Sequence, residues 1–213
     1  MSYTIKARGI IIKEVPVSES DKYLTIFTKD IGKIVVRAKG AKNSKSKFVI
    51  SEIFSYVDFV FYKGNNFNSL TQIELIENFY NIRLNYDILM SAYEIAKIID
   101  KYIQGVIDEE ESNNILLLSI ISFKALSKNY INHDLIFCIF SIKFLQLTGF
   151  EPYIYGNRIQ STVSEILITN DIKNSIHYIL TSEIKKIYNF TIDEKNIREF
   201  KKICTILLSN LEI

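Results

Sequence analysis

Short runs in which apolar and polar residues alternate fill the first 80 positions of the chain. Such alternation is typical of β-strands with one buried face, and the Gly, Asn and Asp residues between the runs favour turns. The turn at residues 29–32 predicts a hairpin between two of these strands. We therefore expect five strands, at residues 3–15, 22–28, 33–38, 53–62 and 68–77.

The spacing of the apolar residues changes at about Tyr80 from the period of a strand to the period of a helix. Residues 108–111 form an acidic first turn, and Asn132 caps a segment that is apolar nearly all round. Thr191 and Glu194 form a capping box before the last helix. The helices are expected at residues 84–103, 115–126, 133–148, 172–188 and 193–211.

The two patterns together predict an α+β chain, in which a five-stranded barrel precedes an α-helical bundle. Five short, coiled antiparallel strands fit the OB-fold, a barrel that binds oligonucleotides. We expect the barrel domain at residues 1–80 and the helical domain at residues 81–213. Within the helical domain, residues 160–169 fit either a lone strand pair or a loop.

The composition is that of an ordinary globular protein, because 48% of the 213 residues are hydrophobic. Cys138 and Cys204 fall in apolar helical patterns, which favours buried free thiols over a disulfide. The sequence shows no secretory signal and no apolar run long enough to span a bilayer. We therefore expect a cytoplasmic protein that makes no membrane contact.

Positive charge is concentrated in the barrel part, although the net charge is only +2. Residues 1–80 carry 12 Lys and Arg against 8 Asp and Glu, whereas the remainder carries 14 against 16. An anionic partner is therefore expected to bind the N-terminal part.

The most basic stretch of that part is GKIVVRAKGAKNSKSK, at residues 32–47. Its β-branched first half predicts a strand, and its polar second half predicts a loop. A cationic loop on a rigid strand suits phosphate binding, because lysines act as mobile point charges. A loop that only keeps the chain soluble is the competing interpretation. The candidate nucleic-acid-binding residues are Lys33, Arg37, Lys39, Lys42, Lys45 and Lys47.

Aromatic residues in the expected strands supply flat surfaces on which bases could stack, each stacked base contributing ~1–3 kcal/mol. By the alternation of strand faces, about half of these rings must instead point into the barrel core. The rings are Tyr23, Phe27, Tyr56, Phe59, Phe61, Tyr62 and Phe67. Lys6, Arg8 and Lys63 are weaker candidate cations, since the pattern does not fix which way they face.

No combination of residues in the sequence points to catalysis. The chain has no phosphate-binding GxxxxGK loop and no nucleophile elbow. The three consecutive glutamates at residues 109–111 are interpreted as a helix N-terminus, His133 as a helix-start residue and His177 as a packing residue. Zinc needs about four nitrogen or sulfur ligands close together. We expect a binding protein that is not an enzyme and holds no metal or cofactor.

Four segments, taken in order, resemble the N-terminal barrel of RecO, a family of bacterial recombination mediators. They are ARGIIIKEV, SESDKYLTIFTKDIGKIVVRAKGAK, FSYVDFVFYKG and LTQIELIENF. Residues 28–41 are the most specific of these, and the similarity continues into the helical part through IFSIKFLQLTGFEP. The resemblance covers the whole chain, strongly to about Pro152 and weakly after it.

The resemblance implies a DNA-binding protein of recombinational repair, associated with the nucleoid. Such proteins bind single- and double-stranded DNA and anneal complementary strands. They act with RecR to place RecA on strands coated by single-stranded-DNA-binding protein. For the helical domain, the resemblance implies docking of partner proteins, including the acidic C-terminal tail of single-stranded-DNA-binding protein.

The chain departs from the family in the segment that follows Pro152. Many members carry a four-cysteine zinc ribbon just after the position of Pro152, but residues 153–162 contain no cysteine here. We expect residues 153–170 to be a reduced, metal-free remnant of the ribbon. Two other functions fit the same residues, an RNA-binding OB module and a helical adaptor between proteins.

Overall fold

The structure, a computed structural model, describes residues 3–43, 51–103, 108–160, 165–209 and 211. The candidate cations Lys45 and Lys47 lie outside the described residues. By its contacts the chain divides into two compact units, Met1–Tyr80 with Ala96–Leu116, and Asn81–Ile95 with Leu117–Ile213. The division into folding domains at residue 80 stays a prediction.

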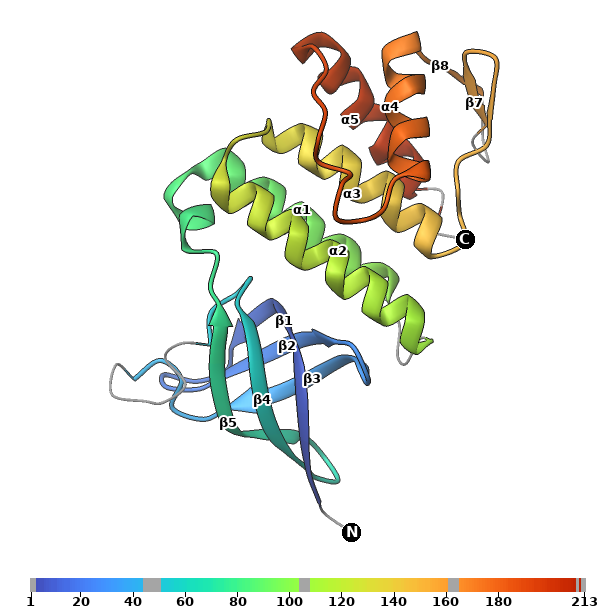
Figure 1. The fold of residues 1–213 in the computed structure, drawn as a ribbon. Coiled ribbons are helices and arrows are strands. Elements are labelled where there is room, and N and C mark those ends of the chain that lie inside the picture. The colour runs from blue at the N-terminus through green and yellow to red at the C-terminus, as the bar shows by residue number, and fades with distance from the viewer. Residues whose placement is uncertain (1–2, 44–50, 104–107, 161–164, 210, 212–213) are drawn as a thin grey trace. The chain divides into compact units, whose positions relative to one another are not determined.

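Five strands form a closed barrel in the first unit, in the order β1-β2-β3-β5-β4 (Figure 1). Neighbouring strands are antiparallel except β3 and β5, which are parallel and close the barrel. The strands are β1 (Tyr3–Pro16), β2 (Lys22–Thr28), β3 (Gly32–Ala38), β4 (Tyr56–Lys63) and β5 (Asn68–Glu77). The five-stranded N-terminal barrel predicted from the alternation is confirmed.

Alternate residues of these strands fill the barrel with aliphatic and phenylalanine side chains. Leu24, Ile26 and Val36 are fully buried there, and the rings of Phe59 and Phe61 stack with their centres 5.9 Å apart. Phe27 is also buried, whereas Tyr62 and Phe67 are exposed. Phe59 and Phe61 therefore point into the barrel core, as predicted for part of the set, whereas the buried ring of Phe27 is not part of that core.

Strand β4 begins three residues later than the sequence pattern predicts. Phe54 has a φ of 69°, a left-handed conformation that an extended strand does not allow. The apolar residues before Tyr56 therefore belong to a buried turn, which alternation alone does not distinguish from a strand.

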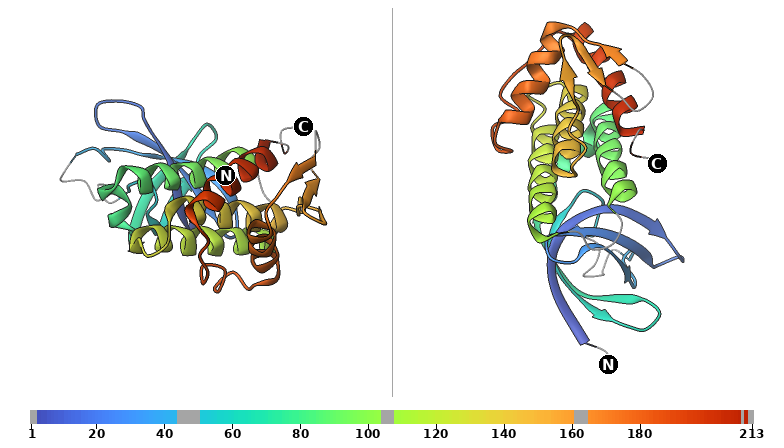
Figure 2. Two further views of the ribbon diagram at one scale, coloured as in Figure 1. Left: turned by 90° about the horizontal axis from the view of Figure 1, so that it is seen from above. Right: turned by 90° about the vertical axis from the view of Figure 1, so that its right-hand side faces the viewer.

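In the part of the chain that the structure describes, one 3₁₀ helix and five α-helices follow the barrel in the sequence (Figures 1 and 2). They are η1 (Tyr80–Leu84), α1 (Tyr86–Tyr102), α2 (Glu109–Lys128), α3 (His133–Leu147), α4 (Asn170–Thr181) and α5 (Glu194–Ser209). Helices α1 and α2 each contribute residues to both units. Among the described helices, none combines the length and apolar character needed to cross a membrane.

Helix α3 is the centre of the second unit. Every residue from Leu135 to Leu145 is buried, and the helix packs against α4 and α5. The side chain of Asn132 accepts hydrogen bonds from the main-chain N–H groups of Asp134 and Leu135, as its predicted capping role requires. The helix is apolar all round because it is surrounded by other helices.

The ends of α4 and α5 differ from the prediction. Helix α4 ends at Thr181 rather than near residue 188, and Ser182 is extended with a ψ of 147°. The predicted capping box of α5 is wrong. The helix begins at Glu194, and Asp193 Oδ1, not Thr191, accepts the N–H of Asn196 at 2.7 Å.

A three-stranded antiparallel sheet lies between α3 and α4 in the sequence, so the strand interpretation of residues 160–169 is confirmed where they are described. Its strands are β6 (Ile154–Tyr155), β7 (Arg158–Gln160) and β8 (Glu165–Leu167). The side chain of Ile159 is fully buried, and Arg158 and Glu165 form an ion pair at 2.5 Å. Within the described residues, no group of three or more His, Cys, Asp or Glu side chains could hold a metal ion. Cys138 and Cys204 are buried free thiols, as predicted.

Candidate nucleic-acid interface

One end of the barrel, where β3 and β4 finish and β1 and β5 begin, presents a row of outward-facing side chains. Strand pairing sets Arg37 beside Ser69, Ser69 beside Tyr62, and Tyr62 beside Thr4. Residues paired across neighbouring strands point to the same face of a sheet. The barrel therefore places a guanidinium group and a phenol ring on one continuous strip, although they come from strands far apart in the sequence.

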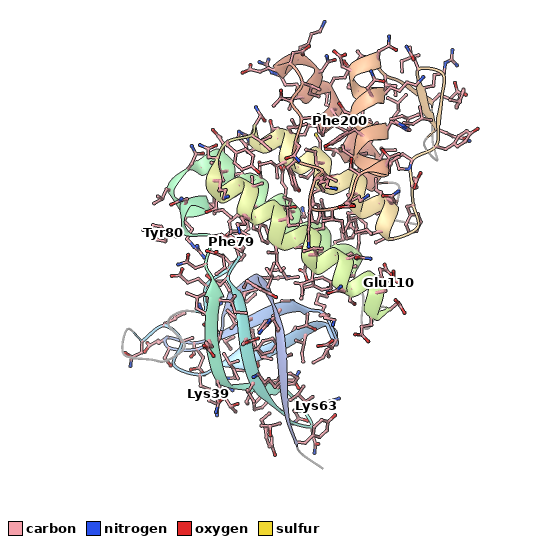
Figure 3. The ribbon with its side chains drawn as sticks, in the orientation of Figure 1. Lys39, Lys63, Phe79, Tyr80, Glu110 and Phe200 are labelled. Atoms are coloured by element: carbon pink, nitrogen blue, oxygen red, sulfur yellow. The ribbon has the colours of Figure 1, made fainter. Side chains whose placement is uncertain are left out.

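The next row toward the same end lies, by the alternation of strand residues, on the other face of the sheet, and it brings a second cation and a second ring to the mouth of the barrel. Lys63 is paired with Asn68 on one side and with Tyr3 on the other. The ammonium of Lys63 lies 5.9 Å from the centre of the Tyr3 ring, which is the range of a cation–π contact. Figure 3 shows Lys63 and Lys39 at this end of the barrel.

A tight turn between β4 and β5 brings Phe67 to the same place. A Cβ atom on Gly64 would lie 2.7 Å from the carbonyl oxygen of Phe67, so the turn requires glycine at that position. The guanidinium carbon of Arg37 lies 5.8 Å from the centre of the Phe67 ring. The turn thus carries an aromatic ring to the arginine that ends β3.

We call this set of residues the barrel-end surface. It consists of Tyr3, Arg37, Lys39, Tyr62, Lys63 and Phe67. The exposed fractions of its three rings are 52% for Tyr3, 41% for Tyr62 and 44% for Phe67, so each has a free surface against which another flat group could stack. Cations interleaved with exposed rings suit a nucleic-acid strand, whose phosphates and bases alternate.

Asp21 holds the basic side of this surface in place. Its Oδ2 accepts hydrogen bonds from Arg37 Nε at 3.1 Å and from Nη2 at 2.7 Å, while its Oδ1 accepts the N–H of Gly40 at 2.8 Å. Gly40 has a φ of +68°, which turns the chain directly after Lys39. The N–H of Gly40, followed by the guanidinium of Arg37, holds the pKa of Asp21 below its usual value.

The loop that follows β3 is anchored to the loop before β2. The N–H of Lys42 donates to the carbonyl oxygen of Ser20 at 3.0 Å, and its ammonium donates to the carbonyl oxygen of Ser18 at 2.7 Å. Lys39 and Lys42 are both exposed. The described part of the basic loop is therefore attached to the barrel both at its main chain and through the ammonium of Lys42, while Lys39 faces solvent.

Lys33 lies at the opposite end of β3 from Arg37, and the structure does not bring it to the barrel-end surface. Its ammonium contacts Asp100 Oδ1 at 3.1 Å and also donates to the carbonyl oxygen of Asp100. Lys13 contacts the other carboxylate oxygen of Asp100 at 2.9 Å. Burial raises the pKa of Asp100, but the hydrogen bonds from Lys13 and Lys33 outweigh this effect and lower it.

The sign of the charge changes along the outer face of β4 and β5. A shallow hollow of about 230 Å³ there is lined by Lys6 together with Asp58 and Glu74. Arg8 forms a two-bond ion pair with Asp58, at 2.6 and 2.8 Å. The acidic residues make this part of the sheet less suited to phosphates than the barrel-end surface.

In the second unit, Glu151, Tyr153, Lys173 and His177 line an open hollow of about 520 Å³. The side chain of His177 is exposed, so its predicted packing role is wrong. Lys143 cannot flank a docking pocket, because its ammonium is turned inward to the end of α4.

His133 stands at the first position of α3, where the sequence predicts a helix-start residue. Its Nδ1 lies 3.0 Å from the hydroxyl oxygen of Ser91 and 3.4 Å from Asp134 Oδ1. These contacts join α1 to the beginning of α3 within the second unit.

Residues 1–79 match the model of a family described as recombination protein O, N terminal. The chain belongs to the RecO family.

Relatives that carry the name DNA repair protein RecO extend the match beyond the barrel. The protein from Acetivibrio thermocellus is 28% identical over 228 residues, which cover 95% of this chain and 89% of the relative. The protein from Clostridium perfringens is 27% identical over 97% of this chain and 92% of the relative. The protein from Caldicellulosiruptor saccharolyticus is 35% identical over 149 residues, which cover 70% of this chain and 59% of the relative.

Three residues that position or pair with the candidate side chains, or join them, were not among those that the sequence suggested. Tyr3 reaches the barrel-end surface through the pairing of β1 with β4, and no local signal gives that register. Asp21 contacts Arg37 from sixteen positions away. Asp100, which contacts Lys33, is 67 positions away. Acidic partners at such separations become visible only when the fold is known.

Proposed function

We propose that the chain binds DNA through the barrel-end surface and anneals complementary single strands as a recombination mediator. In this role it acts in DNA repair and helps to load RecA onto single strands coated by single-stranded-DNA-binding protein. Membership of the RecO family and the name shared by its relatives support the process. The interleaving of Arg37, Lys39 and Lys63 with three exposed rings supports the location.

Phosphate groups would be neutralised chiefly by Lys39, Lys42 and Lys63. These side chains are exposed, and each carries a flexible point charge that can follow a bent backbone. Every phosphate contact releases condensed counterions, so affinity should fall with salt with a slope of about −0.7 per contact on single strands. Lys45 and Lys47 extend the proposal along the same loop.

Bases would stack on the exposed rings of Tyr3, Tyr62 and Phe67. Stacking on a ring uses the face of a base and accepts all four bases, which predicts binding that is largely independent of sequence. It also leaves the hydrogen-bonding edge of each base free to pair. A strand held in this way, with part of its charge neutralised, can accept a complementary strand against weakened phosphate repulsion.

The proposed partners other than DNA are RecR and single-stranded-DNA-binding protein, with the RecA filament as an indirect partner. We place the docking of these proteins on the helical unit. The hollow beside Tyr153 and Lys173 is a candidate surface for it, because an aromatic ring and a cation there face solvent together. Double-stranded DNA would be bound through phosphate contacts alone.

Annealing of two complementary single strands, one of them precoated with single-stranded-DNA-binding protein, tests the proposal across a series of salt concentrations. Acceleration by the wild-type protein that weakens as salt rises is the expected result. A variant in which Lys39, Lys42 and Lys45 are changed to glutamine should lose most of it on any sequence. Unchanged annealing by that variant at moderate salt would contradict the proposed site.

Competition between RNA and DNA of equal length separates this function from an RNA-binding role. Clear preference for RNA would favour an OB module of RNA metabolism. Absence of binding to either polymer at low salt would instead favour a protein adaptor whose basic loop only keeps it soluble.

A further inference from the structure

Arg37 differs from the other cations of the barrel-end surface because its guanidinium group already forms an ion pair with a carboxylate. Its Nε and Nη2 both donate to Asp21 Oδ2, at 3.1 and 2.7 Å. The side chain of Asp21 is 11% exposed and that of Arg37 is 30% exposed, so water screens the pair only in part. An arginine held in this way has little positive charge left for a phosphate, in contrast to the exposed ammonium of Lys39.

The same contact fixes the direction of the guanidinium group. Two donors that converge on one oxygen restrain the guanidinium group, and its carbon lies 5.8 Å from the centre of the Phe67 ring. The ring is 44% exposed. The guanidinium therefore lies over the Phe67 ring, and a planar arginine stacks on bases much as an aromatic side chain does.

Asp21 performs a second task with its other oxygen. Oδ1 accepts the N–H of Gly40 at 2.8 Å and the hydroxyl of Ser20 at 3.1 Å, which fixes the turn after Lys39. The two tasks are separable because each uses a different oxygen atom. An asparagine can keep its carbonyl oxygen on Gly40, but its NH₂ group would face the N–H donors of Arg37 and repel them.

We propose that Asp21 is a positioning residue that makes the barrel-end surface select single-stranded over double-stranded DNA. By holding Arg37 against Phe67, it converts a phosphate-binding cation into part of a stacking platform for an unpaired base. Bases within a duplex are stacked on one another and cannot use such a platform, whereas a free guanidinium binds the phosphates of both forms alike. This inference rests on the proposed DNA binding and adds the selectivity to it.

The variant Asp21→Asn tests this inference directly. Its affinity is measured by fluorescence anisotropy for a labelled thymidine oligonucleotide and for a duplex of the same length. Affinity for the single strand should fall by about threefold to tenfold, since the cation–π arrangement is lost. Affinity for the duplex should hold or rise, with a salt slope steeper by about 0.9 because Arg37 gains a phosphate contact.

A matched control removes the same charge elsewhere on the barrel. Asp58→Asn releases Arg8 from a comparable two-bond ion pair. It should leave the ratio of single-strand to duplex affinity unchanged. A single cooperative melting transition above the assay temperature in each variant would show that the fold survives both changes.

A double-mutant cycle with Phe67→Leu keeps the test decisive if Asp21→Asn weakens the loop. Phe67→Leu alone should lower the affinity for single-stranded DNA and leave the affinity for duplex DNA unchanged. When Phe67→Leu is already present, Asp21→Asn should not lower the affinity for single-stranded DNA any further, because the stacking platform is already lost. Equal losses on both forms of DNA, or an unchanged ratio, would overturn the inference. Absence of DNA binding by the wild-type protein would instead overturn the proposed function itself.

Discussion

The ammonium of Lys143, in the middle of α3, donates to the carbonyl oxygen of Ser182 at 2.9 Å. It also reaches the carbonyl oxygens of Ile179 at 3.2 Å and Leu180 at 3.3 Å, as well as Gln146 Oε1 at 2.8 Å. These carbonyl groups belong to the end of α4, where the last four have no partner within the helix. A buried cation thus caps a neighbouring helix and interacts favourably with the negative end of the helix dipole.

Replacing Lys143 by methionine should therefore destabilise the helical unit, although methionine fits the apolar surroundings. The substitution leaves buried carbonyl oxygens without donors, and we expect a loss of about 2–4 kcal/mol in the free energy of unfolding. Urea denaturation followed by circular dichroism measures it. Lys124→Met, on an exposed position of α2, is the matched control and should change stability by less than about 0.5 kcal/mol. Equal stability of the two variants would contradict the capping role.

The same contact explains why the sequence misplaces the end of α4. Helical spacing of apolar residues continues to about residue 188, and no Gly or Pro breaks it. The helix nevertheless ends at Thr181. The ammonium of Lys143, on α3, donates hydrogen bonds to the carbonyl oxygens at this end. A C-terminal cap supplied through tertiary contact leaves no trace in the local pattern.

Where local chemistry alone decides the structure, the sequence was sufficient to predict it. Strand β2 occupies residues 22–28 as predicted, and Asn132 caps α3. Of the candidate site, the positions of Lys39 and Lys42 on an exposed loop after β3 were also foreseeable. The ion pair that occupies Lys33 was not, because it depends on Asp100 in a helix beyond the barrel.

The contrast between Lys39 and Lys33 predicts different salt dependence for two variants that lose the same charge. Lys39→Gln should make the salt slope of single-strand binding shallower by about 0.7, the contribution of one phosphate contact. Lys33→Gln should leave the slope unchanged, because the ammonium of Lys33 is bound to Asp100. Titrations at several salt concentrations give both slopes. The same reduction in both variants would show that Lys33 reaches DNA despite its ion pair.

Tyr62 provides a test of base stacking that does not involve charge. Its ring is 41% exposed beside Ser69 and Thr4. Tyr62→Leu should weaken binding of a single-stranded oligonucleotide by about 1–3 kcal/mol, or at least about fivefold, without changing the salt slope. Tyr130→Leu removes a tyrosine that is 60% exposed from the helical unit and should have no effect. A change in slope without a change in affinity would show that Tyr62 acts by arranging the cations rather than by stacking.

The pKa of Asp21 predicts how acid affects the barrel. Because the N–H of Gly40 and the guanidinium of Arg37 lower this pKa, the carboxylate stabilises the folded state above the ordinary aspartate pKa of about 3.9. That stabilisation is lost as the pH falls through the lower pKa of the folded protein. Asp21→Asn has no such group to protonate, and it should be less stable than wild type at about pH 6.

Thermal melting of both proteins between about pH 6 and pH 3 measures this effect, since the ordinary aspartate pKa lies within that range. The difference between their melting temperatures should shrink as the pH falls, while other carboxylates affect both proteins alike. Glu14→Gln, at the ion pair with Lys22, controls for the loss of one surface charge. Its melting temperature should follow that of wild type more closely than the melting temperature of Asp21→Asn does. A constant difference between wild type and Asp21→Asn across the range would mean that the charge of Asp21 contributes no stability. Its hydrogen bond to Gly40, which asparagine can also make, would then be what anchors the loop.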